Sequence, residues 1–129
     1  MVALNFTFAP AEYLIPEDLK RTTIRKRNPV KEEQIQRLQN IELYWKQRTP
    51  ECKLLGIRKL KELRVIERTL AEFIMYTPDS TVYKEGFGNN RLDMLQYFEK
   101  NYKELIYEPN AFYIVEWYPE SYSEVKTDE

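Results

Sequence analysis

The first eight residues, "MVALNFTF", alternate between apolar and polar positions. Val2, Leu4, Phe6 and Phe8 fall on one side of an extended chain, and the residues between them fall on the other. A period of two is typical of a strand with one buried face. A second strand is expected at 111–118, "AFYIVEWY", where β-branched and aromatic residues surround a single charge.

Apolar residues recur every three or four positions in three later stretches, which predicts helices. Ile35, Leu38, Ile41 and Trp45 indicate a helix over about 30–48. A second stripe predicts a helix over about 58–76, preceded by a short helix at 50–55 and a break at Gly56. A last helix is expected to begin after the capping residue Asn90 and to end before Pro109.

The stretch "ECKLLGIRKLKELRVI", at 51–66, resembles part of a helix-turn-helix motif. Cys52 stands four residues before Gly56, where the motif takes a small residue, and Gly56 suits the turn. Glu51 and Glu62 depart from the pattern, because they occupy positions that the motif buries. The alternative is an ordinary helical hairpin with a bend at Gly56.

These patterns predict an α+β fold in which three to four helices pack against a small sheet formed by the N- and C-terminal strands. At 129 residues the chain is expected to form a single domain, 1–129. Prolines at 16 and 29 bound a segment that we expect to be an irregular basic arm, 16–29. The last residues, 120–129, form an acidic tail.

The charge is distributed unevenly, although the formal net charge is only -1. Residues 20–68 hold fifteen basic and six acidic side chains, whereas residues 69–129 hold five basic and twelve acidic ones. Segregation of this kind is typical of a protein that contacts a polyanion. The alternatives are that the two halves neutralise each other, or that the cations line an ordinary solvated face.

The cations predict a non-catalytic accessory or regulatory protein that binds DNA or RNA through the phosphate backbone. Six of the nine candidates are arginines, whose planar guanidinium suits phosphate. The candidate nucleic-acid-binding residues are Lys20, Arg21, Arg25, Lys26 and Arg27 in the arm, and Arg58, Lys61, Arg64 and Arg68 on the predicted helix after Gly56.

Histidine is absent and Cys52 is the single cysteine, which excludes the usual zinc sites and the commonest general base. We therefore expect no enzyme activity, no catalytic residues, no metal and no cofactor. The sequence shows no leader and no apolar run of membrane-spanning length, so we expect a cytoplasmic protein without a membrane partner.

The competing hypothesis is a protein interaction module, either an adaptor or an inhibitor. Six aromatic residues fall between 107 and 122, within the acidic half of the chain. Tyrosine and tryptophan are enriched at interfaces, and an exposed strand edge could pair with a protein partner or with a second copy. The candidate partner-binding residues are Tyr113, Trp117, Tyr118 and Tyr122.

Overall fold

The computed structural model of the chain describes residues 1–120 and contains a five-stranded mixed sheet. The strands lie in the order β1-β3-β4-β5-β2; β1 and β3 are parallel, and the other neighbours are antiparallel. Their bounds are Val2–Phe6 (β1), Thr22–Lys26 (β2), Asn40–Trp45 (β3), Lys53–Ile66 (β4) and Phe112–Trp117 (β5). The predicted α+β class is confirmed.

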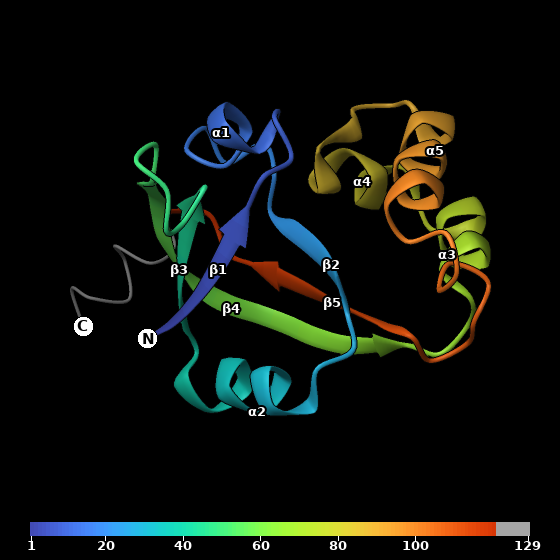
Figure 1. Cartoon of the computed structure of the whole chain (residues 1–129), viewed down its shortest axis with the longest axis horizontal. Coiled ribbons are helices and arrows are strands. Elements are labelled where there is room, and N and C mark those ends of the chain that lie inside the picture. The colour runs from blue at the N-terminus through green and yellow to red at the C-terminus, as the bar shows by residue number, and fades with distance from the viewer. Residues whose placement is uncertain (121–129) are drawn as a thin grey trace.

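Short helices connect the strands. Figure 1 shows α2 beside the sheet and α3, α4 and α5 grouped together at another side of the molecule. The helices span Ala11–Leu14 (α1), Pro29–Leu38 (α2), Leu70–Tyr76 (α3), Asp79–Val82 (α4) and Arg91–Asn101 (α5), with a π-helical turn at Tyr83–Phe87 (η1). Asn90 caps α5 as predicted, because its side chain accepts a hydrogen bond from Asp93 N at 3.0 Å.

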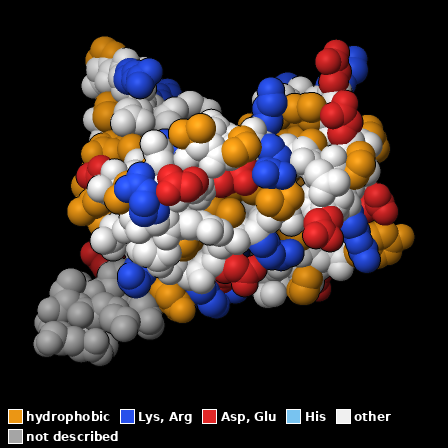
Figure 2. Space-filling view, turned by 90° about the horizontal axis from the view of Figure 1, so that it is seen from below, with side chains coloured by type: hydrophobic (Ala, Val, Ile, Leu, Met, Phe, Trp, Pro, Cys, Tyr) orange, Lys and Arg blue, Asp and Glu red, His pale blue; other side chains and the backbone are white. Residues whose placement is uncertain are grey.

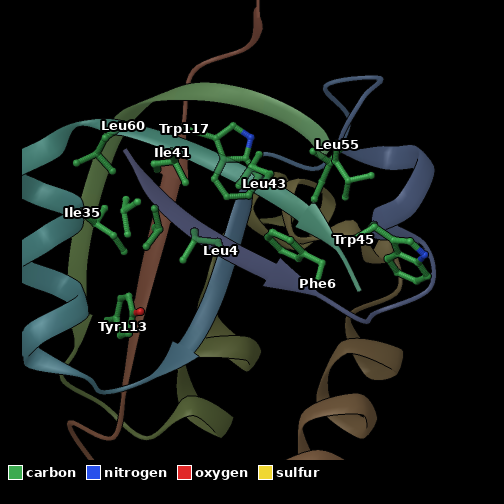
Figure 3. Packing of buried hydrophobic residues seen from close by; sticks show 14 residues of the cluster. Leu4, Phe6, Ile35, Ile41, Leu43, Trp45, Leu55, Leu60, Tyr113 and Trp117 are labelled. Atoms are coloured by element: carbon green, nitrogen blue, oxygen red, sulfur yellow. The ribbon is translucent and has the colours of Figure 1, made fainter. Parts of the chain in front are cut away.

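Two apolar clusters hold the sheet and helices together. Figure 3 shows the first, in which side chains from β1, β3, β4 and β5 converge with Ile35 of α2. The second cluster joins β2, β4 and β5 to α3 and α5, with Ile24, Ile74 and Phe98 among its members. Most side chains in these clusters are nearly inaccessible to solvent, so burial of apolar area dominates the stability of the fold.

The sheet curls so that its two edge strands, β1 and β2, approach each other. Phe6 of β1 meets Trp117 of β5, with 6.3 Å between the ring centroids, although two strands separate them in the sheet order. Arg25 of β2 donates from Nη2 to the Asn5 carbonyl at 2.7 Å and lies over the Phe6 ring. The expectation that the two terminal strands are neighbours is therefore wrong, although both belong to one sheet.

The predicted helix at 30–48 ends at Leu38, because Gln39 adopts a left-handed conformation with φ of 65°. Residues 40–45 then form β3, where Ile41, Leu43 and Trp45 alternate inward. Ile41 and Trp45 lie four residues apart, a spacing that suits both a helix and a strand. Leu43 lies midway between them and is fully buried, as expected in a strand; in a helix it would lie on a different face from Ile41 and Trp45.

The predicted helices at 50–55 and 58–76, and with them the helix-turn-helix, are also wrong. Residues 53–66 form β4, a 14-residue strand that pairs first with β3 and then with β5. The register shifts between Leu60 and Glu62, and such an irregularity changes which side chains face inward. Leu60 and Leu63 consequently pack on the same cluster at a spacing of three, which imitates a helix.

Candidate functional site

Two of the nine candidate cations are buried and paired with acids. Lys20 is 2% exposed and lies 3.5 Å from a Glu85 carboxylate oxygen. Arg58 is also 2% exposed and donates from Nε to Asp18 at 3.0 Å. Charged side chains are buried at this depth only when they are paired, because desolvation is costly.

The other candidate cations lie at or near the surface, and several have acidic partners. Arg27 pairs with Glu32, Lys61 with Glu116 and Arg64 with Glu62. Arg21 and Arg25 are half-buried, and Lys26 and Arg68 are exposed. On the face that Figure 2 shows, Lys and Arg side chains are interspersed with Asp and Glu.

The predicted arm is not irregular, because residues 22–26 form the edge strand β2. The predicted helical stripe of cations after Gly56 does not exist either, because those residues lie on strand β4 and in the turn that follows it. The cations of the predicted arm and the cations after Gly56 therefore do not share a helical face.

The aromatic candidates of the C-terminal strand lie mostly inside the protein. Tyr113 is 2% exposed and Trp117 is 1% exposed, and Tyr118 is half-buried with the Lys61 ammonium 5.9 Å from its ring centroid. Strand β5 lies between β4 and β2, so the expectation of a free strand edge there is wrong. Tyr122 and residues 121–129 of the predicted tail lie outside the described residues.

The free edge of β2 is closed in part by Lys20 and Glu85. Ile24 N donates to Glu85 Oε1 at 3.1 Å, and Lys20 Nζ donates to the Thr22 carbonyl at 2.8 Å. The Thr22 hydroxyl donates to Glu85 Oε2 at 2.5 Å. The two buried charges thus satisfy backbone groups that an edge strand leaves unpaired.

The turn η1 places Glu85 against β2. Arg21 N donates to the Lys84 carbonyl at 2.9 Å, and Lys20 Nζ donates to the Glu85 carbonyl at 2.5 Å. Gly86 has a φ of 108°, and a Cβ there would lie 3.1 Å from the Phe8 ring. A glycine is required at this position both for the backbone conformation and for the space beside Phe8.

A hollow of about 260 Å³ lies where β1, β2, η1 and α5 meet, and we call it the β2-edge pocket. Phe8, Phe87 and Tyr97 form an aromatic wall, with ring centroids 4.9 to 5.6 Å apart. The pocket is lined by Asn5, Phe6, Thr7, Phe8, Lys20, Thr23, Ile24, Arg25, Glu85, Phe87, Tyr97, Phe98 and Tyr102.

Burial shifts the pKa of several pocket residues. The pKa of Lys20 is lowered by desolvation, which the attraction of Glu85 opposes in part. Desolvation also lowers the pKa of Arg25 and raises the pKa of Tyr97. Perturbed ionisable groups in a cleft are a recognised sign of a functional site.

Two other hollows help to define the surroundings. A more open hollow of about 460 Å³ shares Phe8, Phe87 and Tyr97 with the β2-edge pocket and is also lined by Lys100. A groove of about 360 Å³, which we call the β4–α3 groove, runs past Arg64, Arg68 and Tyr76. The β2-edge pocket is the one that combines an aromatic wall with buried charges, so we take it as the candidate site.

Sequence reasoning missed Glu85 and the aromatic wall. Positions 20–26, "KRTTIRK", have three consecutive β-branched residues at the centre, and this enrichment could have indicated the strand. Phe8, Glu85 and Tyr97 are distant in sequence and meet only through the tertiary fold.

Across residues 1–120, no helix combines the length and the apolar character needed to cross a membrane. Within the same range, no cluster of three or more His, Cys, Asp or Glu side chains could hold a metal ion.

Neither a protein-family model nor a curated protein matches the sequence. The fold is similar to the crystal structure of hypothetical protein PH0355, with a TM-score of 0.58 and 12% identity over 92% of this chain and 97% of that one. At this identity the similarity concerns the fold.

Proposed function

We propose that this protein binds nucleic acid by taking one unpaired base into the β2-edge pocket. The observation that carries the proposal is the aromatic wall of Phe8, Phe87 and Tyr97 beside the polar edge of β2. Stacking of a base on an aromatic side chain contributes about 1–3 kcal/mol and is available to every base.

The polar groups of the pocket suit the edge of a heterocyclic ring. In an extended strand the N–H and C=O of one residue point the same way, so the Ile24 carbonyl lies on the edge where its N–H meets Glu85. The carbonyl supplies an acceptor for an N–H group of the ring. Unpaired bases are recognised by such hydrogen bonds combined with stacking.

The size of the pocket favours a single ring system. Its volume of about 260 Å³ is close to the lower end of small-molecule pockets, about 300–1,000 Å³. A base held in a duplex could enter only if it were flipped out of the stack, which costs a few kcal/mol. We therefore expect single strands, RNA or DNA, to bind more tightly than duplexes.

The test compares fluorescently labelled single-stranded and duplex oligonucleotides by anisotropy, using the wild type, Tyr97→Ala and Tyr76→Ala. Tyr76 is 76% exposed in the β4–α3 groove and serves as a matched control. We expect Tyr97→Ala to weaken single-strand binding about 5- to 150-fold, the loss of one stacking contact. Tyr76→Ala should leave it unchanged.

Two results would contradict the proposal. Equal binding of duplexes and single strands would remove the need for an unpaired base. A loss confined to Tyr76→Ala would move the nucleic-acid site to the β4–α3 groove, where that tyrosine is exposed.

A further inference from the structure

We infer that the ligand of the β2-edge pocket carries an anionic group beside its ring, a phosphate, and that Arg25 selects for it. The inference rests on the proposed function and adds the chemical class of the ligand. It follows from the charges that line the pocket and from the unused hydrogen-bonding capacity of one guanidinium.

The pocket carries more positive than negative charge. Lys20 and Glu85 form an ion pair, with Nζ 3.5 Å from the carboxylate oxygen, so their charges offset each other. Arg25 lines the same hollow, and within residues 1–120 the structure gives it no ion pair with an acid. The hollow is left with one uncompensated cation.

The partners of Arg25 are neutral and use part of its capacity. Its Nε donates to Thr23 Oγ1 at 3.1 Å, its Nη2 donates to the Asn5 carbonyl at 2.7 Å, and its guanidinium carbon lies 4.8 Å from the Phe6 ring centroid. A guanidinium has five N–H donors, so these two bonds leave donors for a ligand.

Other cations lie near Arg25, which makes the binding of an anion there more favourable. Arg25 contributes to lowering the pKa of both Lys20 and Lys31, which places a second and a third cation within its electrostatic reach. The acidic side chain that acts on Arg25 electrostatically is Glu85, and it is already paired with Lys20. A partly desolvated cation among other cations is stabilised when an anion binds.

Phosphate is the anion that the geometry fits best. The planar fork of arginine binds phosphate oxygens in pairs, and Phe6 holds the guanidinium plane in place from one side. In a nucleotide the phosphate lies next to the ring that the aromatic wall would stack. The phosphate could be the terminal group of a free nucleotide or a phosphodiester within a strand.

The experiment measures binding of the four ribonucleosides and their 5′-monophosphates by isothermal titration calorimetry. The variants are Arg25→Gln, Arg25→Lys and, as a matched control, Lys26→Gln, which changes an exposed cation on the same strand. We expect the wild type and Lys26→Gln to prefer the monophosphate at least tenfold. Arg25→Gln should reduce the preference below twofold, and Arg25→Lys should retain part of it.

A further arm uses tetranucleotides without terminal phosphates. Dependence of their binding on Arg25 would identify a phosphodiester as the anion, whereas dependence confined to the monophosphates would identify a terminal phosphate. Both results support the inference.

Equal binding of nucleosides and monophosphates by the wild type would overturn the inference and leave the base pocket standing. An unchanged preference in Arg25→Gln would do the same. If nucleosides, nucleotides and single strands all fail to bind, the proposed function fails and the inference with it. Because the first comparison uses the wild type, it decides whether the ligand carries the anion even where Arg25→Gln is unstable, and Arg25→Lys then tests the role of the residue.

Discussion

Lys20 and Glu85 are the residues whose burial has the largest consequences. Both side chains are below 5% exposure, and both bond to backbone or hydroxyl groups of β2 as well as to each other. A buried pair of this kind adds little net stability compared with an apolar pair, but removing one partner leaves a charge that water cannot reach. The pair therefore holds the free edge of β2 in place, and with it the side of the pocket that β2 forms.

We predict that Lys20→Met lowers the free energy of unfolding by about 3–5 kcal/mol, because Glu85 loses its buried counter-ion. Lys53→Met, which breaks an exposed pair with Glu12, should cost at most about 1 kcal/mol. Urea denaturation measures both. The double variant Lys20→Met/Glu85→Gln should lose less than the sum of the single variants. A Lys20→Met loss no larger than that of Lys53→Met would contradict the prediction.

At the scale of the elements, strand β4 shows where sequence patterns mislead. The alternation of 2–8 predicted β1 correctly, because one unbroken period of two continues along the whole strand. The pairing of β4 is irregular once with β3 and once with β5. Each irregularity changes which β4 side chains face inward. The resulting three- and four-residue spacings predicted a helix. No local signal marks such an irregularity, because it depends on the neighbouring strands.

Gly56 has a structural explanation different from the predicted helical turn. A Cβ at this position would clash with the Arg58 guanidinium, and that guanidinium is held by Asp18. We predict that Gly56→Ala lowers the free energy of unfolding by about 1–3 kcal/mol through overpacking. Ile57→Val, on the same strand, should change it by less than about 0.5 kcal/mol.

A double-mutant cycle identifies the cause of the Gly56→Ala effect. Combined with Arg58→Met, the alanine should cost less than it does in the wild type, because the clashing group has been removed. Additive effects would show that Gly56 is required for another reason. Chemical denaturation of the four proteins provides the measurement.

At the scale of the whole molecule, ionisation of buried tyrosines links stability to pH. Desolvation raises the pKa of Tyr97 and Tyr113 above the ordinary value of 10.0, so the folded state holds these protons more tightly than the unfolded state. Stability therefore falls as the pH rises above 10.0 toward the folded-state values.

We predict that Tyr97→Phe reduces this alkaline loss, measured as the change in urea midpoint between about pH 9 and pH 11. Tyr107→Phe removes a phenol that is 62% exposed and serves as the control. An alkaline loss of equal size in both variants would show that Tyr97 does not contribute to it.

The whole molecule also decides how much of the candidate site the sequence could predict. The segregation of basic and acidic residues along the chain was real, but folding pairs many of these groups across elements, as with Lys20 and Glu85 or Lys61 and Glu116. Of the pocket residues, Lys20 and Arg25 were predicted as cations for phosphate. The aromatic wall beside them is formed by segments up to 89 residues apart, which no local sequence pattern could predict.

The salt dependence of single-strand binding distinguishes a pocket from a broad basic surface. Each phosphate neutralised on a single strand contributes about -0.7 to the slope of log K against log salt, so nine engaged cations would give a slope of about -6. With most of these cations paired, we expect contacts from Arg25 and Lys100, and hence a slope of about -1.4. The double variant Arg64→Glu/Arg68→Glu changes residues outside the pocket lining and should change the affinity less than twofold. If the wild type gave a slope near -6 and the double variant made it shallower, the nucleic acid would instead lie along β4.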